Sequence, residues 1–467
     1  MVAHKKLRIT QAVATAKVVI NQDETVSPAV KEVFHSLIDA ITLLTNELGL
    51  NSSNSSKPPS TNLFPIKKPI TAPGKKRKPG GQKGHKGTRL QPVEKPDSVE
   101  TILLDKKSLP PGQYEHIGFE KRQVFDIEVS FSVTEYRAEI LKNKKGEQFV
   151  ANFPDGVTEL AQYGTGVKST SVYMSQHQLI PQARVQDVLK TQYGLSISKG
   201  SVNNFNILAA KKLKDLGFEK WIRGRLMNSS VLHADETGID VNAERFWIHC
   251  LCNGELTLFH ADEKRGKEAM DRMGVLPEFK GKLIHDHWKP YFKYICCHVL
   301  CNAHHLRELQ RAHEQDGQKW ALKMIKLLVE INEAVTQAGG ELSDRRAREF
   351  RKKYRKILRK AEMECPENLK QRAQSKSRNL LERLLEFEEE TLMFMENSDV
   401  PFTNNQGERD LRMTKVQQKI SGCFRSMRGA KDFCLIRSYL STCRKNGIHP
   451  MDALRTLFSG KLPDFMC

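Results

Sequence analysis

A chain of 467 residues, 39% of them hydrophobic, is long enough for about three domains with ordinary cores. Its formal net charge of +20 favours a polyanionic partner such as nucleic acid, although a basic ribosome-associated or membrane-surface protein would share that charge. No apolar run reaches the ~18 residues of a membrane span. The N-terminal stretch A-V-A-T-A-K-V-V-I lacks the pattern of a signal peptide, so we expect a cytoplasmic protein without a membrane partner.

Two segments precede the first predicted globular part. Residues 27–50 carry apolar side chains at helical spacing, which predicts either a plain amphipathic helix or a short coiled coil within an N-terminal helical segment, 1–56. The next segment, 57–95, is rich in Pro, Gly and Ser and contains the run K-K-R-K, which predicts a flexible basic linker. A solvated linker without function would look the same, but the charge run favours DNA contact. The linker residues expected at DNA phosphates are Lys75, Lys76, Arg77 and Lys78.

Residues 96–155 alternate in V-F-D-I-E-V-S-F-S-V, which predicts a small β-rich module, and 156–228 read as a helical DNA-binding region. A helix over 184–193, a turn at Gly194 and a second helix capped by Ser198 have the spacing of a helix-turn-helix, although any packed helix pair would give this pattern. The second helix would present polar side chains to the major groove: Lys199, Ser201, Asn203 and Asn204.

From 229 to 305, short strand patterns surround one helix, which predicts the first part of an α/β core of the ribonuclease-H type. The strands are expected at 231–235, 245–252, 255–259, 283–286 and 296–300, and the helix at 267–273. Residues 306–396 are almost entirely helix formers and include a stretch with ten bases and one acid, which predicts a helical insertion that follows DNA. Residues 397–425 complete the core with one helix, and 426–467 form a C-terminal helical region.

Three acidic residues carry the chemistry that we predict. Asp235 in L-H-A-D-E-T and Asp286 in L-I-H-D-H-W each follow a short apolar run, and Glu408 in N-N-Q-G-E-R-D-L-R lies at the start of a predicted helix. Such carboxylates can hold two Mg²⁺ (or Mn²⁺) ions, which prefer oxygen ligands and promote phosphodiester cleavage. Each acid also has a structural explanation: the aspartates could simply end strands, and Glu408 could complete a capping box begun by Asn405.

Two other metal sites are compatible with the sequence. His233 and Asp235 could join a distant histidine in the facial triad of a non-haem iron enzyme. Cys301 and His304, with Cys296, Cys297 and His305 nearby, could bind zinc, but only one pair has suitable spacing. We therefore leave zinc doubtful and favour a role for His304 beside the acids or at DNA.

The remaining candidates are arginines and thiols. Arg409 and Arg412 flank Glu408 on its helix and could meet DNA phosphates, while Arg412 could alternatively pair with Glu408. The ten cysteines all lie in the second half of the chain, and we expect reduced thiols rather than a disulfide framework.

Several motifs together resemble transposases of the insertion-sequence-66 family, encoded by the large reading frame of a bacterial mobile element. They are N-S-S-N-S-S-K-P-P-S, R-K-P-G-G-Q-K-G-H-K-G, H-A-D-E-T, H-D-H-W-K-P-Y, C-N-A-H-H-L-R-E-L, N-N-Q-G-E-R-D-L-R-M and K-I-S-G-C-F-R-S. The resemblance implies a DDE triad of Asp235, Asp286 and Glu408 on a ribonuclease-H-like core with a helical insertion, and a C-x-x-H element at Cys301 and His304. Family members usually carry paired C-x-x-C zinc motifs before the helix-turn-helix, whereas 96–155 contain no cysteine, so we expect no zinc there.

The residues and the resemblance together predict a DDE transposase. It would bind the terminal inverted repeats of a bacterial insertion sequence and catalyse Mg²⁺-dependent strand cleavage and strand transfer. Its partners would be double-stranded DNA, at element ends and target, further copies of the chain, and small accessory proteins of the same element. A DNA-binding regulator that has lost catalysis and a ribonuclease-H-like nuclease are the alternatives.

Overall fold

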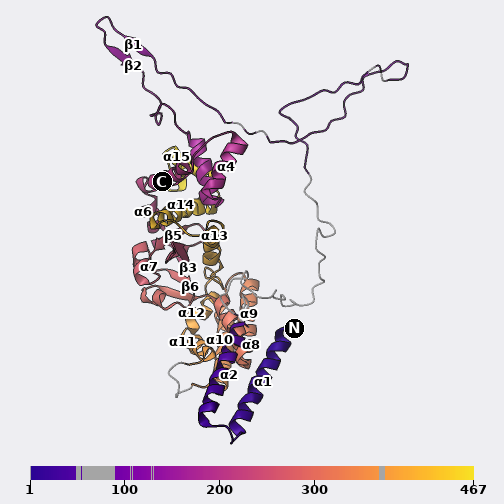
Figure 1. The fold of residues 1–467 in the computed structure, drawn as a ribbon, viewed down its shortest axis with the longest axis vertical. Coiled ribbons are helices and arrows are strands. Elements are labelled where there is room, and N and C mark those ends of the chain that lie inside the picture. The colour runs from indigo at the N-terminus through magenta and orange to yellow at the C-terminus, as the bar shows by residue number, and fades with distance from the viewer. Residues whose placement is uncertain are drawn as a thin grey trace.

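The computed structural model describes most of the chain beyond residue 90 and an N-terminal helix pair (Figure 1). The described residues are 2–48, 54, 90–105, 107, 109–127, 129, 131–367 and 374–466. The predicted linker contacts Lys75, Lys76, Arg77 and Lys78 lie outside them.

A five-stranded mixed sheet forms the centre of the molecule, in the order β5-β4-β3-β6-β7. The strands are β3 (Val231–Val241), β4 (Glu244–Cys252), β5 (Thr257–Asp262), β6 (Lys282–His285) and β7 (Cys297–Leu300). The first three in sequence pair antiparallel, while β6 and β7 run parallel to β3. Two connecting elements complete this part: α7 (Lys267–Met273) and the 3₁₀ turn η4 (Lys289–Lys293). The five predicted strands and the helix are therefore present, and an α/β fold is confirmed.

The edge strand β5 is covered by a helix from the other end of the chain. Helix α14 (Met427–Lys445) lies along β5 and offers hydroxyl groups to its outward N–H groups. Ser438 accepts a hydrogen bond from the N–H of Phe259 at 2.8 Å, and Thr442 accepts one from Thr257 at 3.1 Å. The edge that could otherwise pair with another chain is thus closed by side chains.

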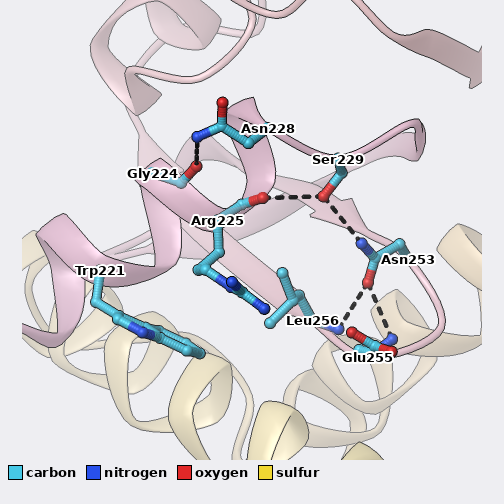
Figure 2. Close-up of a pocket in the computed structure, with 8 residues that line it drawn as sticks. All are labelled: Trp221, Gly224, Arg225, Asn228, Ser229, Asn253, Glu255 and Leu256. Atoms are coloured by element: carbon cyan, nitrogen blue, oxygen red, sulfur yellow. Dashed lines mark hydrogen bonds between the residues drawn. The ribbon is translucent and has the colours of Figure 1, made fainter. Parts of the chain in front are cut away.

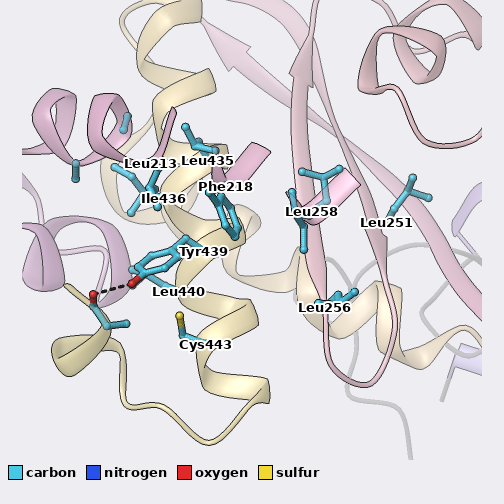
Figure 3. Close-up of a cluster of buried hydrophobic side chains, with 14 of the residues drawn as sticks. Leu213, Phe218, Leu251, Leu256, Leu258, Leu435, Ile436, Tyr439, Leu440 and Cys443 are labelled. Atoms are coloured by element: carbon cyan, nitrogen blue, oxygen red, sulfur yellow. Dashed lines mark hydrogen bonds between the residues drawn. The ribbon is translucent and has the colours of Figure 1, made fainter. Parts of the chain in front are cut away.

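Helices before and after the sheet share one apolar core. They are α3 (Thr165–Val172) with the π turn η3 (Tyr173–His177), α4 (Gln182–Tyr193), α5 (Lys199–Asp215), α6 (Phe218–Met227), α14, α15 (Pro450–Phe458) and the short turn η6 (Asp464–Met466). Figure 3 shows Phe218 and Tyr439 at the centre of this core, packed edge to face at 5.5 Å. The Tyr439 hydroxyl donates to the carbonyl of Ala453 at 2.7 Å, so even this buried polar group is satisfied.

The helix pair predicted at 184–206 is present. Gly194 ends α4 with a left-handed φ of 65°, and the Ser198 hydroxyl caps α5 by accepting the N–H of Ser201 at 3.0 Å. Lys199, Asn203 and Asn204 are exposed, whereas Ser201 is half-buried and its hydroxyl bonds to Ser198. The local structure matches the prediction at every position except the Ser201 side chain.

Between β7 and α13 (Asn405–Ser421) the chain forms a helical insertion. Its elements are α8 (Asn302–Asp316), α9 (Lys319–Gln337), α10 (Asp344–Glu364), α11 (Lys376–Glu386), α12 (Glu388–Leu392) and the turn η5 (Met393–Met395). Their common core includes Ile284 and Val299 from the sheet, which fixes the insertion beside β6 and β7 (Figure 1).

Several positive charges of the basic helix α10 are neutralised by acidic side chains elsewhere in the insertion. Arg351 is 11% exposed at its side chain and pairs with three glutamates, at 2.7–3.4 Å. Lys353 and Arg355 also have acidic partners, at 2.9 Å each. Part of the charge expected to follow DNA is therefore neutralised within the insertion.

The N-terminal segment is a helix pair. Helix α1 (Val2–Gln22) and α2 (Pro28–Leu48) lie side by side, and Lys17 pairs with Asp39 at 3.1 Å. Helix α2 was expected from its apolar spacing, and α1 was not. Helix α2 therefore has a partner within the chain itself, and Ile38 is its buried apolar residue.

The β-rich module predicted over 96–155 is found only in part. One hairpin is present, formed by β1 (Ile140–Lys142) and β2 (Gln148–Val150), and every residue of its strands is exposed. The alternating run at 124–133 is not a strand over its described residues, because no neighbouring segment there covers an apolar face.

In the part of the chain that the structure describes, no helix has both the length and the apolar character that crossing a bilayer requires.

Candidate active site

The sheet register brings the two predicted aspartates to the same level. The parallel pairing of β3 with β6 ends at His233 opposite Ile284, and two further residues along each strand lead to Asp235 and Asp286. Asp286 directly follows β6, as predicted. Asp235 does not end its strand, because β3 continues to Val241 and pairs with β4 along that length. Its predicted place at a strand end is wrong, yet it lies where β6 ends.

Helix α13 brings Glu408 to the same place through a close approach at Gly407. A Cβ atom at Gly407 would lie 3.3 Å from the Cβ of Asp235, so glycine lets the helix start directly on β3. The capping-box alternative for Glu408 is wrong, because Asn404 rather than Asn405 precedes the helix and no side chain caps it. The Glu408 carboxylate instead pairs with Arg307 of α8 at 3.4 Å.

Asn404 fixes this approach and was not found from the sequence. It is 2% exposed, and its amide donates to the carbonyl of Ala234 at 2.8 Å. Its amide oxygen is hydrogen-bonded to His233 at 2.8 Å, and its N–H donates to the sulfur of Cys301 at 3.1 Å. Through its side chain and its backbone N–H, Asn404 thus connects the start of α13 to β3 and to the residue before α8.

The electrostatics indicate that the neighbouring acids act on Asp235. Burial raises the pKa of Asp235 well above its ordinary value, and the negative charges of Glu236, Asp286 and Glu408 raise it further. A single proton or cation at this position would therefore relieve repulsion among several carboxylates. Asp235 thus lies near enough to Asp286 and Glu408 for their charges to affect it, and the catalytic role of the three acids stays a prediction.

Glu236 is a fourth acid that the sequence analysis missed. Burial and then Asp286 raise the pKa of Glu236, whose side chain is 3% exposed and points to the opposite face of the sheet from Asp235. The hydroxyl of Tyr291 donates to it at 2.6 Å, and Arg265 donates at 2.7 Å. The only indication of Glu236 in the sequence is that it directly follows Asp235.

Arg265 connects Glu236 to the loop that carries Asp286. Its guanidinium lies over the rings of Trp247 and Trp288, at 4.8 Å and 4.4 Å from their centres. The N–H of Trp288 in turn donates to the carboxylate of Asp286 at 3.1 Å. The Asp286 side chain is therefore oriented by a chain of packed and hydrogen-bonded groups.

Two arginines and a histidine from the insertion complete the surroundings. Burial lowers the pKa of Arg383 to about 10, and the attraction of Asp286 opposes that shift. Burial and then Arg307 lower the pKa of His304, while Asp286 and Glu408 oppose the change. The structure thus places His304 beside the acids, as expected. Arg409 and Arg412 are exposed on α13.

Two groups of possible metal ligands occur among the described residues. The ligand atoms of Cys301, His304 and Glu408 lie within 4.8 Å of one another, as do those of Cys250, Cys252 and Asp410. Asp410, however, pairs with Lys445 at 2.6 Å, which already supplies a positive charge. Neither group contains His233, whose Nδ1 bonds to Asn404, so the iron-triad alternative has no support. The described cysteines are free thiols, as predicted.

The oxygen-rich cluster fits a hard divalent cation. Asp235, Asp286 and Glu408 provide carboxylate oxygens, and the charges of Asp286 and Glu408 raise the pKa of Asp235. Beside Glu408, Cys301 and His304 add a sulfur and a nitrogen atom, which are ligands that softer metals prefer.

The cavity in Figure 2 is a different place from the acid site. It measures about 380 Å³ and is lined by residues that include Trp221, Arg225, Asn253 and Glu255. Its Ser229 precedes β3, and the six residues of largely extended chain from there to Asp235 span on the order of 20 Å. The acids therefore do not line it.

A family model described as "Transposase IS66 family" matches residues 161–432, which is more than half of the 467 residues. The chain belongs to the IS66 transposase family. This confirms the resemblance read from the motifs, and the match contains Asp235, Asp286 and Glu408. Membership implies a DNA-processing enzyme, and therefore DNA as a binding partner.

Residues 6–91 of this IS66-family transposase match a second family model, described as a family of unknown function (DUF6444). That match covers the helix pair and the basic linker. No curated protein matches the chain. DDE transposases generally use a divalent metal, and the described residues include two groups of possible metal ligands, one of which contains Glu408.

Proposed function

We propose that this IS66-family transposase binds the terminal inverted repeats of an insertion sequence and catalyses strand cleavage and strand transfer with Asp235, Asp286 and Glu408. The observation that carries the proposal is the convergence of these acids: Gly407, beside Glu408, lies against Asp235, and the charges of Asp286 and Glu408 raise the pKa of Asp235. The sheet order β5-β4-β3-β6-β7, with the acids on β3, after β6 and on α13, supports the predicted ribonuclease-H-like core.

The acids would hold two divalent ions, Mg²⁺ or Mn²⁺, which activate the attacking oxygen and stabilise the leaving oxygen in phosphodiester chemistry. Water would attack the phosphorus at the element end, and the bond from phosphorus to the 3′-oxygen would break. The freed 3′-hydroxyl would then attack a phosphorus of the target strand and displace its 3′-oxygen. No covalent protein intermediate is needed, so no Ser, Tyr or Cys nucleophile is required.

DNA binding would be divided between two regions. The exposed Lys199, Asn203 and Asn204 at the start of α5 would read base edges as the second helix of a helix-turn-helix. Ser201, held by Ser198, would instead support the helix start. The linker residues Lys75, Lys76, Arg77 and Lys78 would supply sequence-independent phosphate contacts, with Arg409 and Arg412 closer to the acids.

Purified full-length protein, labelled terminal repeats of its element and Mg²⁺ provide the test. We expect 3′-end cleavage followed by joining to target DNA, and neither product with the Asp235→Asn variant. Binding of the repeats without any cleavage would favour the regulator. Cleavage without joining, or without preference for the repeats, would favour the nuclease.

A further inference from the structure

One arginine beside the acid cluster, Arg307, forms an ion pair with Glu408 and with no other acid in the described part of the chain. Arg307 pairs with Glu408 at 3.4 Å, and the two side chains are 27% and 32% exposed. Both groups therefore remain partly in water, where an ion pair is worth only ~0.2–1 kcal/mol. Such a pair can be exchanged for stronger partners.

The neighbouring arginines are held differently. Arg383 pairs with Glu308 of α8, and its side chain is only 18% exposed. Arg311, one turn after Arg307 on the same helix, pairs with Asp316 at 2.9 Å and is 13% exposed. Among these three arginines of the insertion, Arg307 alone has a proposed metal ligand as its acidic partner.

A divalent cation and Arg307 compete for the same carboxylate. A cation that takes Glu408 as a ligand brings twice the charge of a guanidinium and binds the carboxylate oxygens directly. Arg307 would then lose its partner while remaining on α8 beside the acids, in the region that the scissile phosphate must enter. A planar guanidinium binds two phosphoryl oxygens at once, which suits it to that second ligand.

We propose that Arg307 is a catalytic residue with two successive ligands: Glu408 before the cation binds, and the scissile phosphate of DNA afterwards. The inference rests on the proposed function, because it requires the cation at Glu408 and DNA as substrate. It gives the helical insertion a direct part in catalysis.

If Arg307 exchanges Glu408 for phosphate, its removal should strengthen metal binding and weaken DNA cleavage. In Arg307→Gln, Mn²⁺ measured by calorimetric titration of the full chain should bind about two- to five-fold more tightly, because a competing partly exposed ion pair is lost. Strand cleavage by the same variant should fall at least ~10²-fold, as when a donor to developing charge is removed. Arg311→Gln is the matched control and should change neither quantity.

A purely structural arginine would give a different result. If metal binding and cleavage both weaken in Arg307→Gln, or if both are unchanged, the exchange is overturned. Arg307→Lys provides a second variant in which the charge and much of the packing remain. It should bind Mn²⁺ nearly as the parent does and still lose cleavage at least ~10-fold, since it cannot bind phosphate in the same two-pronged manner; full cleavage activity would count against the proposal.

Asp235→Asn separates this inference from the function on which it rests. If that variant binds Mn²⁺ as tightly as the parent, the metal site itself is misplaced and the proposed function fails. If Asp235→Asn abolishes Mn²⁺ binding while Arg307→Gln shows neither expected change, only the exchange at Arg307 fails.

Discussion

Two aspartates of the same sheet have pKa values shifted in opposite directions: Asp262 at the end of β5 and Asp235 within β3. Burial alone would raise the pKa of Asp262, but Arg272, at 2.8 Å, and the N–H of Lys264 lower it to about 2. Burial and neighbouring acids raise the pKa of Asp235 instead. Asp262 is neutralised by Arg272, whereas the charges of the acids around Asp235 add to the effect of its burial. A neutralised acid of this kind maintains the fold, while a buried acid among other acids is a candidate for an active site.

The largest expected effect concerns the three acids of the proposed site. Asp235→Asn, Asp286→Asn and Glu408→Gln should each lower cleavage of terminal-repeat DNA at least ~10³-fold, because each removes a charged metal ligand while keeping its size. Binding of the same DNA in a mobility-shift assay should change little. An active Glu408→Gln variant would show that the third ligand lies elsewhere.

Asp262→Asn should have the converse effect. It removes the partner of Arg272, so we expect a loss of ~1–3 kcal/mol in the free energy of unfolding, moderated because Arg272 is half-exposed. Cleavage per folded molecule should be unchanged. In the parent protein the contribution of Asp262 should disappear as the pH falls from about 4 toward 2, since its folded pKa is depressed. Denaturant melts across that range would measure it.

Asp235→Asn should stabilise the protein when no divalent cation is present. The raised pKa of Asp235 means that the native state loses stability as the pH rises above the unfolded value of about 4, and asparagine removes that cost. We expect a gain of ~1–2 kcal/mol that is larger at pH 8 than at pH 5. Thermal melts in EDTA would measure the gain. Added Mg²⁺ should raise the melting temperature of the parent and not that of the variant.

The smallest expected effect is at the covered sheet edge. Ser438→Ala removes the acceptor for the N–H of Phe259 and should cost ~1 kcal/mol in unfolding free energy, without altering cleavage. The exposed Ser459 on the C-terminal side of α15 offers a control, and Ser459→Ala should be close to neutral. Equal losses in the two variants would mean that the edge contact contributes nothing of its own.

The sequence predicted the sheet well because its strands are short apolar runs with helix patterns between them. It placed the end of β3 too early, since the residues after Asp235 include Gly238 and look like a turn. In the structure a Cβ at Gly238 would clash with the guanidinium of Arg245. The glycine therefore makes room for a side chain of β4, and pairing between the strands outweighs local preference.

The sequence selected the three acids, which stay a predicted site, and it did not select the residues that support them. Asp235, Asp286 and Glu408 follow recognisable motifs, so their residue types and spacing were sufficient to select them. Asn404 and Gly407 looked like loop residues, and their roles depend on the approach of α13 to β3. Arg307 and Arg383 were two among many bases of the insertion. Only tertiary packing distinguishes these two arginines from those of the insertion that lie away from the acids.

The position of Asn404 and Glu408 far along the chain has a consequence for synthesis on the ribosome. Asp235 and Asp286 emerge more than a hundred residues before Glu408, and the cover of β5 at Ser438 and Thr442 emerges later still. A nascent chain that has folded only as far as the insertion holds two of the three acids and an open sheet edge. We therefore expect unfinished or truncated products to be unable to cut DNA and to be prone to aggregation, so that cleavage competence arrives only when translation is nearly complete.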